Sequence, residues 1–137
     1  MDWYFKVLKQ YSRFNGRARR KEYWYFSLIN VLILFLLLFL TSLSTSLLIS
    51  QQSDDIFIGI RLLITIVDLL RIVYFLGILL PWAAVTVRRL HDIGKSGWWY
   101  WINFVPIVGG FILLYFLVQD SEPDRNRFGR NPKESID

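Results

Sequence analysis

The chain has 137 residues, of which 54% are hydrophobic and 18% aromatic, and 16 Lys and Arg against 11 Asp and Glu give it a formal net charge of +5 at pH 7. This length suffices for one domain. The sequence contains no cysteine, which excludes disulfide bonds, thiol nucleophiles and thiolate metal sites. The basic balance leaves two classes of partner to consider, nucleic acid and the anionic surface of a membrane.

Residues 1–14, MDWYFKVLKQYSRF, have the periodicity of an amphipathic helix. At 100° per residue Trp3, Val7 and Tyr11 share one face, and Lys9 lies on the opposite face. Two interpretations of this helix remain open. Either it lies in the plane of the membrane interface, or it packs as a short helix on the rest of the protein.

The segment 25–49 contains no charged residue, and residues 31–40 within it are all apolar. A helix on the surface of a soluble protein keeps a polar face, and this one has none. A helix of this length extends about 37 Å, and the hydrocarbon core of a bilayer is about 30 Å thick. We therefore predict a first transmembrane helix over 25–49. The uncharged run is longer than the hydrophobic core of a cleaved signal peptide.

The next apolar region, 56–87, is too long for one upright span and too short for two, and three charged residues interrupt its outer half. We predict an interfacial helix over 56–70 at the outer surface, followed by a second span over 71–87. Pro81 is expected to kink the second span. A single long tilted helix is the alternative.

The third apolar region, 98–119, carries no charge and contains Pro106 and the pair Gly109-Gly110. We predict a third, kinked span over 98–119. A re-entrant hairpin that turns between Pro106 and Gly110 is the alternative. The polar tail, 120–137, lacks apolar periodicity.

Positive charges are concentrated before residue 26 and in the loop 88–97, whereas the segment 50–71 carries only two. The positive-inside rule therefore places the N-terminal arm and the loop in the cytoplasm, and the segment 50–71 and the tail outside. The six tryptophans all fall near the expected inner ends of the spans, where amphipathic rings sit among headgroups. Because the aromatic side chains have this role, we expect no nucleic-acid partner.

These segments predict an all-α integral membrane protein with three transmembrane helices, an N-terminal amphipathic interfacial helix and an outer interfacial segment. The inner cations are expected to converge on one face: Arg17, Arg19, Arg20, Lys21, Arg88, Arg89 and Lys95. Each cation near an anionic leaflet contributes about 1 kcal/mol of attraction. We therefore expect a non-enzymatic protein, without cofactor, that binds anionic lipid, a second copy of itself or another membrane protein through this face.

Three charged residues, Arg61, Asp68 and Arg71, fall on one side of a helix and form a polar stripe. We expect this stripe to face water at the membrane edge. The alternative is a small transport or channel component, in which the stripe lines a water-filled path.

His91 and Asp92 form the only adjacent pair of a histidine and an acid. Neighbouring residues on a helix point about 100° apart, so they do not face each other. One histidine without cysteine does not make a metal site, and we predict none. We expect an inner-face polar network in which Asp92 pairs with Arg17, Arg19 or Arg20. An enzyme that acts on lipid headgroups with His91 and Asp92 is the alternative.

Three motifs occur in order along the chain: GRARRKEYW at 16–24, RRLHDIGKSGWW at 88–99 and NRFGRNP at 126–132. Together they resemble domain-of-unknown-function family 805, small multi-span proteins of the bacterial inner membrane. The resemblance covers nearly the whole chain. It implies a multi-span protein of the inner membrane whose activity is not established, and it supplies no catalytic residues.

Overall fold

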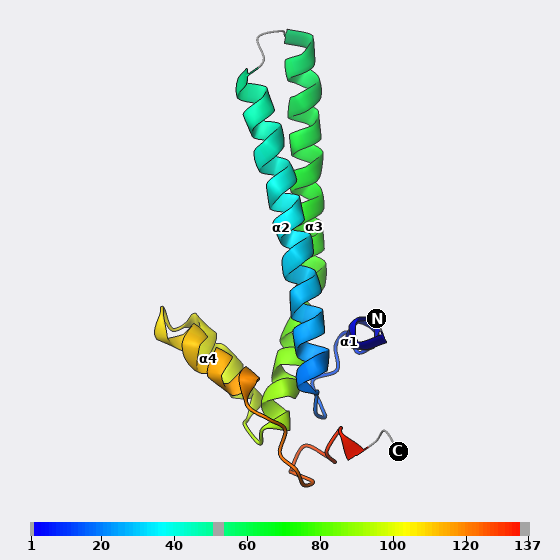
Figure 1. The fold of residues 1–137 in the computed structure, drawn as a ribbon, viewed down its shortest axis with the longest axis vertical. Helices are drawn as coiled ribbons and strands as arrows, with labels where there is room; N and C mark the ends of the chain where they lie inside the picture. Colours follow the sequence, from blue (N-terminus) through cyan, green and yellow to red (C-terminus); the bar gives the residue numbers. More distant parts are fainter. Residues whose placement is uncertain (1, 51–53, 135–137) are drawn as a thin grey trace. The chain divides into compact units, whose positions relative to one another are not determined.

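The computed structural model of the chain describes residues 2–50 and 54–134, and its regular structure is helical (Figure 1). The elements in chain order are α1 (Asp2–Lys9), α2 (Arg20–Ser50), α3 (Asp54–Asp92), the 3₁₀ helix η1 (Gly97–Phe104) and α4 (Val108–Val118). Strand pairing among the described residues is limited to a bridge between Asn126 and Gly129. The predicted all-α class is confirmed.

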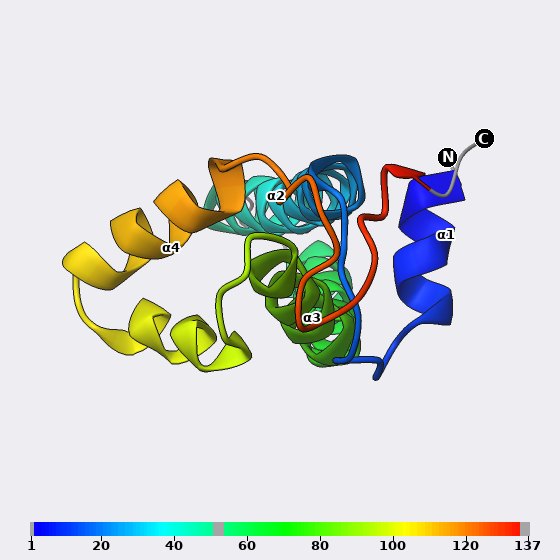
Figure 2. The same ribbon diagram turned by 90° about the horizontal axis from the view of Figure 1, so that it is seen from below.

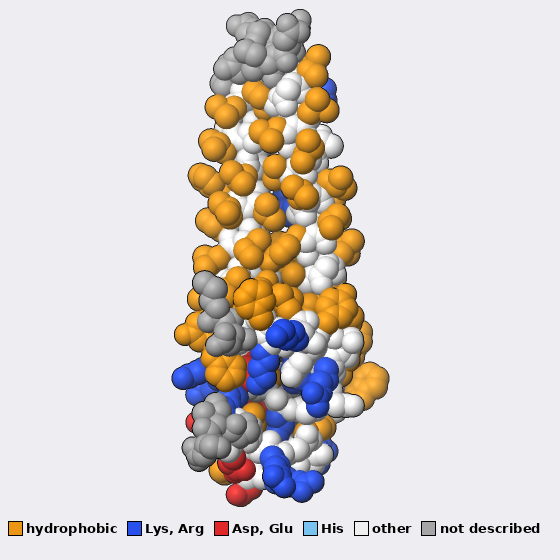
Figure 3. Space-filling view, turned by 90° about the vertical axis from the view of Figure 1, so that its right-hand side faces the viewer, with side chains coloured by type: hydrophobic (Ala, Val, Ile, Leu, Met, Phe, Trp, Pro, Cys, Tyr) orange, Lys and Arg blue, Asp and Glu red, His pale blue; other side chains and the backbone are white. Residues whose placement is uncertain are grey.

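The chain divides into two compact units. Unit 1 comprises Met1–Ser27 and Leu80–Asp137, and unit 2 comprises Leu28–Leu79. All but two of the sixteen Lys and Arg residues belong to unit 1, the exceptions being Arg61 and Arg71. All six tryptophans also belong to unit 1. On the face shown in Figure 3, hydrophobic side chains cover unit 2, and charged side chains gather over unit 1.

Unit 2 consists of consecutive apolar parts of α2 and α3 that expose most of their large side chains. Phe35 is 67% exposed and Leu76 is 62% exposed. A hydrogen bond of 2.6 Å from the Tyr74 hydroxyl to the buried Asn30 amide oxygen joins the two helices. Within the described residues, two helical stretches are long and apolar enough to cross a membrane, Arg20–Leu47 and Ile58–Asp92.

The helix predicted over 25–49 is present in the structure, whereas the region 56–87 differs from the prediction. The segment 25–49 lies within α2, which begins at Arg20. The predicted division of 56–87 into an interfacial helix over 56–70 and a span over 71–87 was wrong, because α3 is helical without interruption from Asp54 to Asp92. The predicted division was based on the thickness of a membrane, which does not control where backbone hydrogen bonds form. No residue near position 70 breaks a helix, and Pro81 removes only one donor.

The predicted third span over 98–119 was also wrong. Its residues form a hairpin in which η1 and α4 run side by side, joined by a turn at Val105–Ile107 (Figure 2). With 11 residues, α4 extends about 16 Å, roughly half of a hydrocarbon core. A Cβ at Gly109 would overlap the Ile102 carbonyl oxygen, so glycine permits the close approach of the two arms.

The core of unit 1 forms where α1, the first turns of α2, the last turns of α3, and α4 meet. Its fully or nearly fully buried side chains include Val7, Phe26, Val85 and Leu117. Tyr4 of α1 stacks on Phe26 with ring centroids 5.3 Å apart. Of the two interpretations of the N-terminal segment, the structure therefore shows packing on the rest of the protein. The helix ends at Lys9, earlier than the predicted 1–14.

Candidate functional site

Asp92, the last residue of α3, lies at the centre of a buried ion-pair network in unit 1. Its side chain is fully buried. One carboxylate oxygen accepts a hydrogen bond of 2.9 Å from Arg17 Nε, and the other accepts from Arg89 Nη1 and the Ser121 hydroxyl. The expected ion pair between Asp92 and an arginine of the N-terminal arm is present, and the structure selects Arg17. Three donors from three segments compensate the burial of this charge.

Arg17 also binds the polar tail. Its Nη1 donates to the Asp124 carbonyl at 2.8 Å, and its Nη2 donates to the Glu122 carbonyl at 2.6 Å. The Glu122 amide in turn donates to the Asp92 carbonyl at 3.0 Å. The tail therefore lies against the N-terminal arm and the end of α3. This packing does not fit the prediction that the arm and the tail lie on opposite sides of the membrane, and it favours the alternative in which 98–119 turns back.

His91 lies beneath the tail instead of in an open site. Its ring stacks on Phe128 with centroids 3.8 Å apart and planes 6° apart. Its Nδ1 lies 3.2 Å from the Gly16 carbonyl oxygen, and its own carbonyl accepts a hydrogen bond from Asn126 Nδ2. The three sequence motifs therefore meet in one packed cluster. The side chains of His91 and Asp92 bind different partners.

The seven cations expected on one face divide into three groups. Arg17, Arg88 and Arg89 are buried, with at most 2% of the side chain exposed, so they do not form a surface. Lys95 lies over the Phe116 ring at 5.6 Å. The remaining three are Arg19, which directly precedes α2, and Arg20 and Lys21 at its start, and they line a cavity. The sequence does not distinguish these groups, because all seven are Lys or Arg residues in the two basic segments 17–21 and 88–95.

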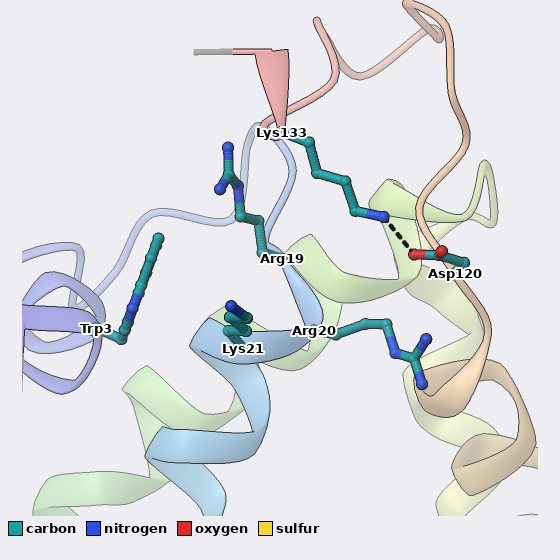
Figure 4. Close-up of a pocket in the computed structure, with 6 residues that line it drawn as sticks. All are labelled: Trp3, Arg19, Arg20, Lys21, Asp120 and Lys133. Carbon is teal, nitrogen blue, oxygen red and sulfur yellow. Dashed lines mark hydrogen bonds and ion pairs between the residues drawn. The ribbon is translucent and has the colours of Figure 1, made fainter. Parts of the chain in front are cut away.

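This cavity, which we call the basic cavity, has a volume of about 680 Å³ (Figure 4). Its lining residues are Trp3, Arg19, Arg20, Lys21, Asp120 and Lys133. They come from α1, the segment that leads into α2, the first residues of α2, and the tail. Sequence reasoning missed three of them, Trp3, Asp120 and Lys133. The amphipathic pattern of α1 marked Trp3 as part of a packed face, but the tail was expected on the other side of the membrane.

The charges of the basic cavity are unbalanced. Lys133 Nζ forms an ion pair of 2.6 Å with Asp120, and this hydrogen bond lowers the pKa of the Asp120 carboxyl. Among residues 2–50 and 54–134, no carboxylate lies within ion-pair distance of Arg19, Arg20 or Lys21. The Arg19 guanidinium lies 5.8 Å from the centre of the Trp3 ring. Its Nη2 is shielded from solvent and has no hydrogen-bond partner in the described part of the chain. The arrangement suits an anion.

The polar stripe lies in unit 2, on α3. Arg71 Nη2 forms an ion pair of 2.9 Å with Asp68 Oδ1, and both side chains are about one-third exposed. Arg61 is exposed on the same helix. This ion pair joins the stripe residues Asp68 and Arg71. Within the described residues, no group of three or more His, Cys, Asp or Glu side chains is arranged to hold a metal ion.

Comparison with known proteins identifies the family. Residues 11–130 match the family described as "Protein of unknown function (DUF805)". The chain is 43% identical over 133 residues to the inner membrane protein YhaH of Escherichia coli (strain K12), covering 97% of this chain and 98% of that protein. It is 37% identical over 133 residues to the inner membrane protein YhaI of the same strain, covering 97% of each. No solved structure matches the chain. The resemblance carried by the three motifs is therefore confirmed, and the chain belongs to family DUF805 as an inner membrane protein.

Proposed function

We propose that this protein is a non-enzymatic, multi-pass inner membrane protein whose unit 1 binds the phosphate of anionic phospholipid headgroups in the basic cavity. One observation carries the proposal. Three cationic side chains without a carboxylate partner in the described residues line the same cavity, and the fourth cation already neutralises Asp120.

Phosphate fits the donors that the cavity offers. A guanidinium presents a planar fork that binds phosphate oxygens in a bidentate manner, and a lysine ammonium adds a point charge. The shielded Arg19 Nη2 has no partner in the described residues, and an unsatisfied buried donor costs about 1–3 kcal/mol. A phosphate oxygen would satisfy it. Trp3 at the same cavity has the amphipathic character of residues that sit at the headgroup boundary.

The distribution of charge supports a cytoplasmic location for unit 1. Fourteen cations belong to this unit and two belong to unit 2, an asymmetry typical of the positive-inside rule. The arm and the tail then both face the cytoplasm, and two helices cross the membrane. Labelling of Ser96→Cys by an impermeant thiol reagent tests this orientation on a chain without cysteine. We expect labelling in inverted vesicles only, and labelling in intact cells would contradict it.

Lipid retention measured by native mass spectrometry tests headgroup binding. The protein in detergent is offered phosphatidylglycerol and phosphatidylcholine in equal amounts. The wild type is expected to retain phosphatidylglycerol preferentially. In Arg19→Gln/Arg20→Gln/Lys21→Gln the amount of phosphatidylglycerol retained is expected to fall at least tenfold, because each cation contributes about 1 kcal/mol.

A matched variant controls for net charge. Lys9→Gln/Arg13→Gln/Arg130→Gln removes three exposed cations outside the basic cavity and is expected to change retention less than twofold. Equal losses in both variants would mean that headgroups are attracted by total charge and not by the cavity. Equal retention of the two lipids by the wild type would also overturn the proposal.

A small transport or channel component is a second candidate. It rests on the Asp68–Arg71 ion pair, which lies within one of the two helical stretches long and apolar enough to cross a membrane. Arg61, on the same helix, would complete the polar stripe. Ion flux into vesicles that contain the protein tests this role: flux that Asp68→Asn abolishes would favour it over headgroup binding.

A further inference from the structure

We infer that the hairpin of η1 and α4, here called the apolar hairpin, enters one leaflet of the bilayer and turns back near the midplane. Its partner is the acyl chains of the leaflet that faces the charged part of unit 1. The inference does not depend on headgroup binding, because none of the residues that line the basic cavity belongs to the hairpin.

The surface of the apolar hairpin has no polar face. Ile107 is 83% exposed and Phe111 is 71% exposed, at and just after the turn. Further exposed side chains of the hairpin include Trp98, Trp101, Phe104, Val108, Leu114 and Tyr115. Between residues 98 and 118 the polar side chains are limited to Tyr100, Asn103 and Tyr115. A continuous apolar surface of this kind is not stable in water, and acyl chains cover the part of it that does not pack in the core of unit 1.

The lengths of the two arms match the thickness of one leaflet. The 11 residues of α4 extend about 16 Å as an α-helix, and the 8 residues of η1 extend about 16 Å as a 3₁₀ helix. The hydrocarbon core is about 30 Å thick. Neither arm crosses it alone, but each reaches from the headgroups to the midplane.

Backbone amides at the turn form hydrogen bonds within the hairpin, as an apolar environment requires. The Val105 amide donates to the Ile102 carbonyl at 2.9 Å, and the Gly109 amide donates to the Val105 carbonyl at 3.1 Å. Pro106 has no amide hydrogen. A turn can enter hydrocarbon only when its backbone groups are satisfied within the protein, and these contacts supply much of that requirement.

Both ends of the hairpin are fixed in the charged part of unit 1. Just before its start, the Lys95 amide donates to the Leu90 carbonyl of α3 at 2.9 Å. At the end, Arg89 Nε donates to the Leu117 carbonyl at 3.2 Å, and the same guanidinium donates to the Gln119 carbonyl. The chain therefore leaves and re-enters the same polar layer, as a re-entrant segment does and a crossing helix does not.

Depth measurements by spin labelling test the inference. Single cysteines at Ser96, Ile107 and Gln119 of the full chain are labelled with a nitroxide in vesicles of phosphatidylethanolamine and phosphatidylglycerol. Collision rates with oxygen and with a water-soluble nickel chelate are then measured. We expect the Ile107→Cys label to be deep, with high oxygen and low nickel accessibility, and the Ser96→Cys and Gln119→Cys labels to lie at headgroup depth.

Three outcomes would overturn the inference. High nickel accessibility at Ile107→Cys would place the turn in water, and low accessibility to both reagents would mean that another protein covers it. Reaction of Gln119→Cys with an impermeant reagent on the side opposite to Ser96→Cys would show a complete crossing. The label depth at Ile107→Cys is expected to be unchanged in Arg19→Gln/Arg20→Gln/Lys21→Gln, so failure of headgroup binding and failure of this inference are distinguished.

Discussion

Unit 1 and unit 2 each contain an ion pair on α3, and the two pairs are built differently. In unit 1, Asp92 is fully buried and takes donors from the arm, from its own helix and from the tail. In unit 2, Asp68 pairs with Arg71 one turn away, and both side chains are about one-third exposed. A carboxylate can be buried only where several distant segments bring donors to it, so the pair at Asp92 organises a fold and the pair at Asp68 does not.

The largest effect is expected from Arg17→Ala, because this change removes one ion-pair partner of a buried carboxylate and the hydrogen bonds to three carbonyls of the tail. The free energy of unfolding in detergent should fall by about 3–5 kcal/mol. Trypsin should also cleave the tail faster. Arg125→Ala, which removes an exposed cation of the tail, serves as the control. Equal stability of the two variants would mean that Asp92 does not depend on Arg17.

A smaller effect is expected from Gly109→Ala, which tests the non-local packing of the apolar hairpin. The new methyl group would overlap the Ile102 carbonyl oxygen, and overpacking of this kind costs about 1–3 kcal/mol. Its matched control is Gly110→Ala, where the nearest atom is Asn103 Oδ1 at 3.9 Å. The control should be neutral or more stable by about 0.5–1 kcal/mol. Thermal unfolding of the two variants measures the difference, and the reverse order would disprove the close approach.

A still smaller effect is expected from Phe128→Leu, because this change removes the ring that stacks on His91 but keeps an apolar side chain. The expected loss is about 0.5–1.5 kcal/mol in the free energy of unfolding, with faster hydrogen exchange at the tail. Phe14→Leu changes an exposed ring of the arm and should be nearly neutral. A tail that exchanges as slowly in Phe128→Leu as in the wild type would contradict a role for the stack.

The smallest effect is expected at the ion pair in unit 2. A double-mutant cycle with Arg71→Gln and Asp68→Asn should give a coupling energy of about 0.2–1 kcal/mol, the range of partly exposed pairs. This measurement also sharpens the comparison between the units. A coupling energy above about 3 kcal/mol would place the pair in hydrocarbon, and the transport role would then gain support.

The sequence predicted correctly those features that depend on one continuous segment of the chain. The uncharged run within α2 was recognised because length and hydrophobicity suffice to define a membrane helix. The three motifs were sufficient to indicate the family, because each is a short run of neighbouring residues. The reasoning failed where membrane thickness was used to divide α3 and to count 98–119 as a span, because a bilayer does not decide where a helix ends.

The candidate site was predictable only in part. Arg19, Arg20 and Lys21 were named as binding residues, and they line the basic cavity. Arg17 and Arg89 were named with them but are buried around Asp92. Position in the sequence does not separate these two groups, since all five are arginines or lysines in basic segments.

The amino-acid sequence by itself determined the helical class, the strongly uneven distribution of cations and aromatic rings, and the family, because composition and short motifs are local properties. Only the tertiary structure decided that Arg17 is the arginine that pairs with Asp92, that the tail packs on the arm, and that 98–119 folds back on itself. The physical reason is that each of these features depends on contacts between residues distant in the chain. Satisfying a buried charge and fitting a carbonyl against Gly109 are conditions on neighbours in space.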